Sequence, residues 1–192
     1  NEVQFSTDDN KIIKSEFAEY NKIKGIIKLK QKVKATDNQN NQILAEYAEY
    51  NDKTKVFKTF GPTEVITSEK YILKGEDLIL DEKNFIKSDT SSILSDADGN
   101  KIYLENFIYQ IKEKIFKSIG SIKIEDKFKN NYEFSQIYID TKKKELLGTD
   151  IKSYINNERF KVNKKNKPRI FANTVKIKEK GNLFNKSVFT IC

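Results

Sequence analysis

Apolar and polar residues alternate with a period of two in six stretches of the chain. The stretches are SEFAEYN (15–21), AEYAEYN (45–51), GEDLILD (75–81), LENFIYQ (104–110), FSQIYID (134–140) and ANTVKIK (172–178). Their first residues lie 30, 30, 29, 30 and 38 positions apart, and the fourth and sixth residues are apolar in every copy. This spacing predicts a β-strand with one buried face, because a helix would bring together residues three and four apart.

Each stretch is followed by a short polar segment and then by a second apolar strand. These strands open with KVFKTFG (55–61), NFIKSDT (84–90) and KIFKSIG (114–120), and we predict turns near Asn51–Lys55, Asp81–Asn84 and Lys142–Glu145. Counting in steps of two gives one face of the second strand: Phe57, Gly61, Val65; Phe116, Gly120, Ile124; and Leu147, Ile151, Ile155. Each copy is thus a β-hairpin that cannot bury its apolar face alone, so stacked copies predict an all-β, antiparallel body of about a dozen strands.

The apolar face of such a sheet can be hidden in a packed sandwich, in a closed barrel or in a trough that stays open. Eight residues mark this face at the fourth and sixth positions of four copies. They are Leu78, Leu80, Phe107, Tyr109, Ile137, Ile139, Val175 and Ile177. The pattern alone is compatible with a dry core as well as with the lining of a groove.

Composition narrows the class of partner. The chain has 192 residues, enough for one domain with a real core, and 33% of them are charged, with a net charge of +8. This charge favours partners with phosphate or carboxylate groups, such as nucleic acid, anionic lipid or glycolipid, although lysines that solvate exposed strands would give the same count. Nucleic acid is not expected, since the aromatic residues alternate into the sheet instead of interleaving with a basic patch.

The side chains needed for catalysis are scarce. There is no histidine and only one cysteine, which excludes a disulfide within the chain and a cysteine-rich metal site. The hydroxyl column Thr59, Ser88, Ser118 and Thr149 has no histidine to activate it, and we read DADGN (96–100) as a turn because it lacks the full set of calcium ligands. The lysine column Lys58, Lys87 and Lys117 lies one residue off the inward face and is expected to point to solvent. We therefore expect no enzyme, no metal and no cofactor.

The copies resemble the OstA-type repeat of the lipopolysaccharide-transport proteins. LAEYAEYNDKTK (44–55) is similar to the strand of that repeat, which opens with a small and an acidic residue and ends with an aromatic residue and Asp or Asn. NKPRIFANTVKI (166–177) followed by SVFTIC (187–192) resembles the end of the periplasmic domain of the LPS-assembly outer-membrane protein, the LptD family. The resemblance covers roughly residues 15–192. It departs from the family at Gly75 and Leu104, where Ala is usual.

The resemblance implies a β-jellyroll or V-shaped β-trough, formed by one domain of six repeats over residues 1–192, on the periplasmic face of the outer membrane of a Gram-negative cell. Its eight-residue apolar column would hold the acyl chains of lipopolysaccharide and pass them to an outer-membrane barrel that is absent from this fragment. The implied partners are a periplasmic bridge protein, added as an edge strand near the N-terminus, the chain's own C-terminal barrel, and an outer-membrane lipoprotein plug. Cys192 would form a disulfide with the missing barrel; a plain buried thiol is the alternative.

Two other classes remain open at this point. One is a free-standing periplasmic lipopolysaccharide bridge of the same fold, which would be favoured if the natural chain ended soon after Cys192. The other is a self-assembling structural β-solenoid with a dry core, which tight packing and the absence of bound lipid would favour.

Overall fold

The computed structural model of the chain is built from β-strands. It describes all residues except 1, 8–9, 157–167, 179 and 192, so Cys192 and its expected disulfide lie outside the described residues. Within the described part there are seventeen strands, paired antiparallel, and no helix that could cross a membrane. The all-β, antiparallel fold predicted from the alternation is therefore confirmed.

The chain divides into two compact units, Asn1–Ala97 and Asp98–Cys192. The first unit contains β1 (Val3–Ser6), β2 (Ile12–Ser15), β3 (Phe17–Asn21), β4 (Ile26–Thr36), β5 (Gln42–Asn51), β6 (Val56–Ile66), β7 (Ile72–Glu76), β8 (Ile79–Asp81), β9 (Phe85–Ser88) and β10 (Ser92–Ser95). The second contains β11 (Lys101–Leu104), β12 (Phe107–Gln110), β13 (Ile115–Glu125), β14 (Asn131–Asp140), β15 (Glu145–Tyr154), β16 (Arg169–Lys178) and β17 (Gly181–Thr190). That all six copies form a single domain stays a prediction.

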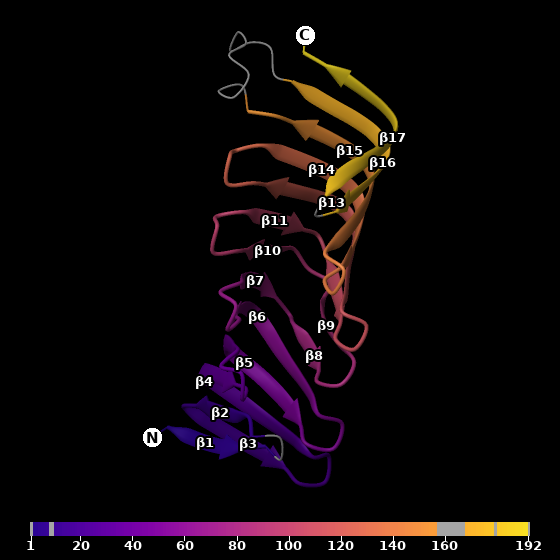
Figure 1. Cartoon of the computed structure of the whole chain (residues 1–192). Coiled ribbons are helices and arrows are strands. Elements are labelled where there is room, and N and C mark those ends of the chain that lie inside the picture. The colour runs from indigo at the N-terminus through magenta and orange to yellow at the C-terminus, as the bar shows by residue number, and fades with distance from the viewer. Residues whose placement is uncertain (1, 8–9, 157–167, 179, 192) are drawn as a thin grey trace. The chain divides into compact units, whose positions relative to one another are not determined.

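Within each unit, long strands that follow one another in sequence are neighbours in the sheet, as the ribbon in Figure 1 shows. In the first unit β4 pairs with β5 and β5 with β6; in the second the pairing runs without interruption from β13 to β17. This order follows from the sequence, because each copy supplies two strands joined by a turn too short to cross over another strand.

Several long strands are bent near the middle, where the pairing register shifts. β4 pairs with β3 before the bend and with β2 after it, and β6 and β13 likewise change partners, from β8 to β7 and from β12 to β11. Left-handed backbone marks several of the bends: Lys32 (φ 50°), Gly61 (φ 75°), Asp77 (φ 51°), Gly120 (φ 114°) and Asp150 (φ 52°). We call the line of bends in each unit its crease. The crease divides each sheet into two leaves, one before and one after the bend.

The turns repeat the same local chemistry. One set ends in the left-handed residues Lys55, Lys114 and Lys144, spaced by the repeat. The turn that leads to Lys55 is closed by Asn51, whose Oδ1 accepts hydrogen bonds from the backbone N–H groups of Lys53 and Thr54 (3.0 Å each). Two of the three predicted turns are found at residues 52–55 and 82–84, and the third lies one residue earlier than predicted, at 141–144.

Asparagine side chains link the turns of successive copies. The Oδ1 of Asn41 accepts a hydrogen bond from the N–H of Ser68 (2.9 Å), and the Oδ1 of Asn130 accepts one from the N–H of Asn156 (2.8 Å). Asn100 accepts from Lys127 in the same way (2.9 Å). These bonds satisfy turn N–H groups that the strand pairing leaves free. They also connect the turn of one copy to the turn of the next at one end of the strands.

The bends also correct one prediction about the faces of the strands. Leu147 does not lie on the inward face: it is exposed, and it pairs with Tyr138 on one side and Lys176 on the other. Leu146 and Gly148 take the inward positions, and Ile151 follows on the same side after the bend at Asp150. Counting in steps of two fails here because a residue in left-handed conformation at the bend inverts the alternation.

Candidate functional site

The eight residues of the predicted apolar column lie on the inward face in two rows. The crease row contains the fourth positions of the copies, Leu78, Phe107, Ile137 and Val175; the lip row contains the sixth positions, Leu80, Tyr109, Ile139 and Ile177. In the second unit the strand register brings the lip row together, since Tyr109 pairs with Phe116, Phe116 with Ile139, and Leu146 with both Ile139 and Ile177. Leu78 and Leu80 lie in the first unit.

The two rows differ in burial. The crease row is closed: the exposed fractions of Leu78, Phe107, Ile137 and Val175 are 3%, 5%, 3% and 2%. All four residues of the lip row are half-buried. The second leaf of the second unit repeats the gradient, with Ile122 and Phe134 buried near the crease and Ile124 and Tyr132 half-buried farther out. The two leaves of this unit therefore meet near the crease and leave partly open apolar side chains away from it.

The first unit is packed more tightly. Its core joins residues of both leaves in one cluster: Ile13, Leu29, Val33, Ala35, Ala48, Tyr50 and Phe57. Leu80, the lip-row residue of this unit, is partly buried against that cluster. The apolar interior of the first unit is therefore largely filled by its own side chains, whereas most of the half-open lip row belongs to the second unit.

The buried hydroxyl groups stabilise the backbone at the crease. Ser118 Oγ donates to the carbonyl of Asn106 (2.6 Å) and Ser88 Oγ to that of Glu76 (2.8 Å), while Thr59 Oγ1 accepts from the N–H of Leu78 (3.0 Å). These backbone groups lie where a strand breaks, so the hydroxyls replace hydrogen bonds that the bent strand cannot make. Thr149 was wrongly assigned to this column, because Gly148 holds the corresponding inward position.

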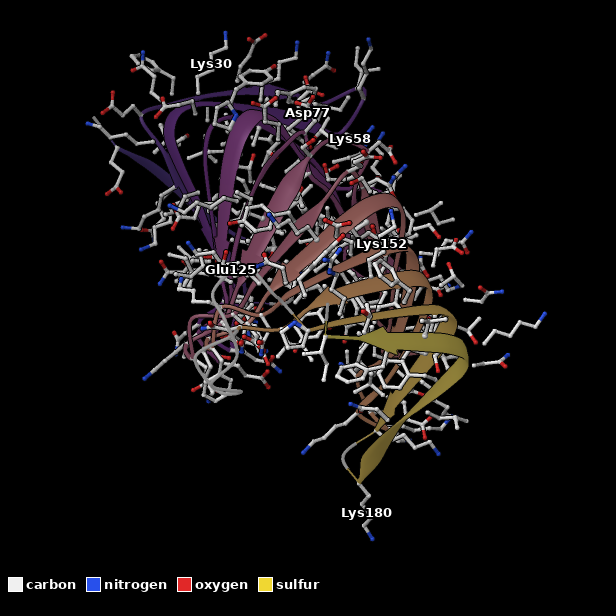
Figure 2. All side chains as sticks on the ribbon, turned by 90° about the horizontal axis from the view of Figure 1, so that it is seen from above. Lys30, Lys58, Asp77, Glu125, Lys152 and Lys180 are labelled. Carbon is white, nitrogen blue, oxygen red and sulfur yellow. The ribbon has the colours of Figure 1, made fainter. Side chains whose placement is uncertain are left out.

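Charged side chains lie on the outward face. Lys58 pairs with Glu49 in the register and Lys117 with Tyr138, both positions that alternate with the inward rows. Figure 2 shows Lys30 and Lys58 projecting away from the ribbon of the first unit. Lys32 at the crease forms an ion pair and hydrogen bond with Glu16, which lowers the pKa of the glutamate and raises that of the lysine. The predicted solvent-facing lysine column is thus found on the outward face.

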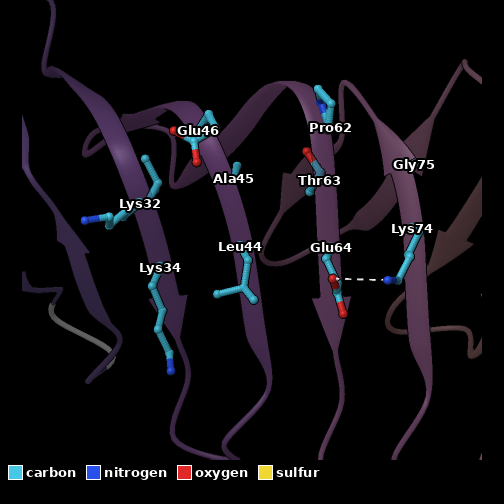
Figure 3. A pocket seen from close by; sticks show the side chains of 11 residues that line it. Lys32, Lys34, Leu44, Ala45, Glu46, Pro62, Thr63, Glu64, Lys74 and Gly75 are labelled. Carbon is cyan, nitrogen blue, oxygen red and sulfur yellow. Dashed lines mark ion pairs between the residues drawn. The ribbon is translucent and has the colours of Figure 1, made fainter.

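The outward face of the first unit carries two hollows with charges of both signs. The larger one, about 550 Å³ in volume, is shown in Figure 3. Lys32, Lys34 and Lys74 line it together with Glu46 and Glu64, and Lys74 and Glu64 form an ion pair across it (3.5 Å). The second hollow, about 380 Å³, includes Glu49, Lys58 and Lys87. Because opposite charges are mixed in both, neither selects clearly for an anion or for a cation.

The second unit carries a hollow of about 470 Å³ on its outward face that the sequence analysis missed. Exposed apolar residues Ile119, Tyr138, Leu147 and Leu183 line it. The sequence contained one indication of this hollow. The fifth residue of each copy should face outward, yet it is apolar in three copies, at Ile79, Ile108 and Tyr138.

The DADGN segment is a turn between β10 and β11, as predicted. Among the described residues no three His, Cys, Asp or Glu side chains are grouped so that they could hold a metal ion. The described residues thus form apolar rows on the inward face of the sheet, and lysines such as Lys58 and Lys117 lie on the opposite face.

Comparison with known proteins adds little to this geometry. No model of a known protein family matches the chain, and no characterised protein matches its sequence. Among solved structures the chain is similar to LptH, the LptA-homologous periplasmic component of the conserved lipopolysaccharide transport device from Pseudomonas aeruginosa. The two share 15% sequence identity and a TM-score of 0.32 over 73% of this chain and 82% of that chain, a similarity too low to establish a shared function.

Proposed function

We propose that this chain is a non-enzymatic lipid carrier of lipopolysaccharide transport, which holds acyl chains between the diverging leaves of its second unit. The observation that carries the proposal is the change from a closed crease row to a half-open lip row on the same apolar face. A fully packed sandwich has no reason to leave Tyr109, Ile139 and Ile177 half-buried on its inward side. The repeat and its OstA-type resemblance support the same conclusion from the sequence.

The chemistry required is transfer without a bond change. Each methylene group that leaves water for the lip row gains about 0.8 kcal/mol, so several chains are held firmly without polar contacts. Because these contacts are non-directional, a chain can also slide along the row from one strand to the next. In this function Tyr109, Ile139 and Ile177 contact lipid, while Phe107, Ile137 and Val175 support the leaves beneath it.

The finer assignment follows from the C-terminal segments. We propose the periplasmic domain of an LptD-type protein, working at the outer membrane with a bridge protein before it and a barrel and lipoprotein plug after it. Cys192 would then be joined by a disulfide to the barrel. A free-standing bridge protein is the alternative, and sequencing the gene downstream of the codon for Cys192 separates the two, because the LptD-type assignment requires a long β-barrel segment there.

The lip row can be tested with one substitution. A photocrosslinking amino acid at position 177 should capture lipopolysaccharide in cells, and Ile139→Asp should abolish that capture while the protein still melts cooperatively. Ile139 is half-buried, so the new carboxylate can reach water but repels acyl chains from the row. Tyr138→Asp is the matched control: it places the same charge on the neighbouring residue, which faces outward, and should leave capture at position 177 unchanged.

Two results would contradict the proposal. One is normal capture at position 177 by a folded Ile139→Asp protein, which would place the lipid elsewhere. The other is unfolding of Ile139→Asp together with failure of the unsubstituted protein to capture lipid, which would indicate a dry core.

The dry-core alternative has one observation in its favour. The cluster around Tyr50 and Phe57 fills the interior of the first unit with protein side chains. A structural β-solenoid that self-assembles through its edges would need no more than that. Lipid analysis of the purified chain distinguishes the two functions, since a structural solenoid should carry no copurifying acyl chains.

A further inference from the structure

The outward hollow of the second unit has a different character from the inward rows and from the hollows of the first unit. The register places Lys117, Tyr138, Leu147, Lys176 and Leu183 side by side in one row across β13 to β17. Ile119 lies in the next row, on the same face. This row occupies the opposite face of the strands that carry Ile137, Ile139 and Ile177.

The apolar side chains of this hollow are open to solvent. Ile119 is 61% exposed and Leu183 69%, while Leu147 and Tyr138 are exposed to a lesser degree. Four such residues line the hollow of about 470 Å³. The volume lies in the range of small-molecule sites, about 300–1,000 Å³.

The charges of the hollow have one sign. Its only charged lining residues are lysines, Lys117 and Lys176, whereas both hollows of the first unit mix lysine with glutamate. Lys117 Nζ lies 5.6 Å from the centroid of the Tyr138 ring and has no carboxylate partner among the described residues. On the other side of the hollow, Lys176 forms an ion pair with Glu145 (Nζ to Oε2, 3.1 Å). An apolar strip with a free ammonium group at its side complements an acyl chain that ends in an anionic group.

We propose that this hollow is a second lipid site, which binds one single-chain amphiphile with an anionic head, such as a fatty acid carboxylate, independently of the inward trough. The chain lies along Ile119, Tyr138 and Leu147, and Lys117 binds the head group. Since the site and the lip row are on opposite faces of one sheet, a ligand in one does not displace a ligand in the other.

The test uses the full chain and monomeric decanoate below its micelle concentration. Titration is followed by calorimetry and by the NMR ring signals of Tyr138, assigned with a Tyr138→Phe variant. We expect saturable binding that perturbs Tyr138. The double variant Ile119→Gln/Leu147→Gln should weaken it about tenfold, the equivalent of losing contact with roughly two methylene groups. Both side chains are exposed, so its melting temperature should not change.

Three further variants test the parts of the proposal separately. Lys117→Gln should weaken decanoate binding about two- to fivefold at low salt, as expected for an exposed charge pair, and should not change binding of uncharged decyl glucoside. Leu44→Gln, at the mixed-charge hollow of the first unit, is the matched control and should have no effect. Ile139→Asp, which tests the lip row, should also leave the Tyr138 response intact, so the two sites can fail separately.

The proposal is overturned if decanoate leaves the Tyr138 signals unchanged, or if the double variant binds it as well as the unsubstituted chain does. It is also overturned if the hollow responds only to lipid vesicles, which would make it a membrane contact. The same holds if the double variant abolishes self-association in sedimentation while decanoate has no effect, which would make the hollow an interface between copies of the chain.

Discussion

At the scale of single residues, the structure depends on polar side chains that form hydrogen bonds with backbone groups left without a backbone partner. Asn130 is the clearest case, because it is buried and its carboxamide bonds on both sides. Its Oδ1 accepts from the N–H of Asn156, and its Nδ2 donates to Asp126 Oδ2 (2.7 Å). Asp126 in turn accepts from the N–H groups of Phe128 (2.8 Å) and Asn130 (2.9 Å). The turn is thus held together by a compact cluster of polar hydrogen bonds.

Asn130→Ala should destabilise the chain by about 1–3 kcal/mol, because it removes a buried carboxamide and leaves the part-buried N–H of Asn156 and Oδ2 of Asp126 each with one partner fewer. The measurement is the free energy of unfolding in urea. Asn131→Ala is the control: the side chain of Asn131 only reaches the Lys129 carbonyl at 3.4 Å near the surface, so its loss should change stability by less than about 0.5 kcal/mol. Equal effects of the two changes would contradict the role given to the linking asparagines.

Asp126 should make part of the stability depend on pH. Burial raises the pKa of its carboxyl, but hydrogen bonds from the side chain and backbone of Asn130 and from the backbone of Phe128 outweigh it, so the pKa lies below its usual 3.8. A carboxyl whose pKa is lower in the folded state stabilises the fold above the pKa of the unfolded chain, and this contribution is lost as the pH falls through the folded value.

Asp126→Asn should therefore lower the free energy of unfolding at about pH 7, and the difference from the unsubstituted protein should shrink at about pH 3. Urea titrations at both pH values measure it. Asp89→Asn serves as the control, since Asp89 is exposed and paired with Lys87 at the surface (3.0 Å). A difference for Asp126→Asn that stayed constant from neutral to acidic pH would show that the carboxylate charge is not what stabilises the turn.

The sequence predicted these residue-scale features only in part. The polar segments after the copies located the turns that follow Asn51, Asp81 and Asp140 to within one residue, and each of these Asx side chains accepts a hydrogen bond from a turn N–H group. The sequence pattern did not predict the linking role of the asparagines, although Asn100 and Asn130 lie one repeat apart. A polar residue in a polar turn does not reveal its burial in the sequence, since burial there depends on the neighbouring copy.

At the scale of the element, the crease decides what each strand does. The bent strands β4, β6 and β13 place one half against each of two shorter partners, and the hydroxyls of Thr59 and Ser118 complete the hydrogen bonding at the break. The sequence showed strands and their inward faces, but not the bend, because the left-handed residues at Lys32, Asp77 and Asp150 are not glycines. The assignment of Leu147 to the wrong face followed directly from this.

Ser118→Ala tests the crease. Ser118 is buried and donates to the Asn106 carbonyl, so its loss leaves a backbone acceptor unsatisfied at the break and should cost about 1–3 kcal/mol. Ser121→Ala lies on the same strand just past Gly120, at an exposed position, and should be nearly neutral. Calorimetric melting of both variants gives the comparison. If Ser118→Ala melts like the unsubstituted chain, the hydroxyl of Ser118 only fills space.

At the scale of the whole molecule, the apolar inward face of each unit reaches an edge strand that, among the described residues, is paired on one side only. In the first unit, Tyr20 on β3 stands in the lip row of the first copy, since it pairs with Ile27, which pairs with Tyr50. Tyr50 is buried but Tyr20 is 54% exposed, because among the described residues no strand pairs with the far side of β3. At β17 of the second unit, Phe189 is likewise 54% exposed on the inward side, since it pairs with Ile170, which pairs with the buried Ser153.

An added strand at β3 would cover Tyr20 and extend the apolar row by one copy, which is the physical basis for predicting that a bridge protein docks at this edge. Tyr20→Lys should therefore reduce capture of the partner by photocrosslinkers placed along β1 and β3 by about tenfold or more, because a charge would face the incoming strand. The fold should persist, since Tyr20 is exposed. Leu183→Lys puts the same charge on the edge of the second unit and should leave capture unchanged. If Leu183→Lys prevents capture and Tyr20→Lys does not, the partner docks at β17 and the direction of lipid transfer along the chain is the reverse of the one proposed.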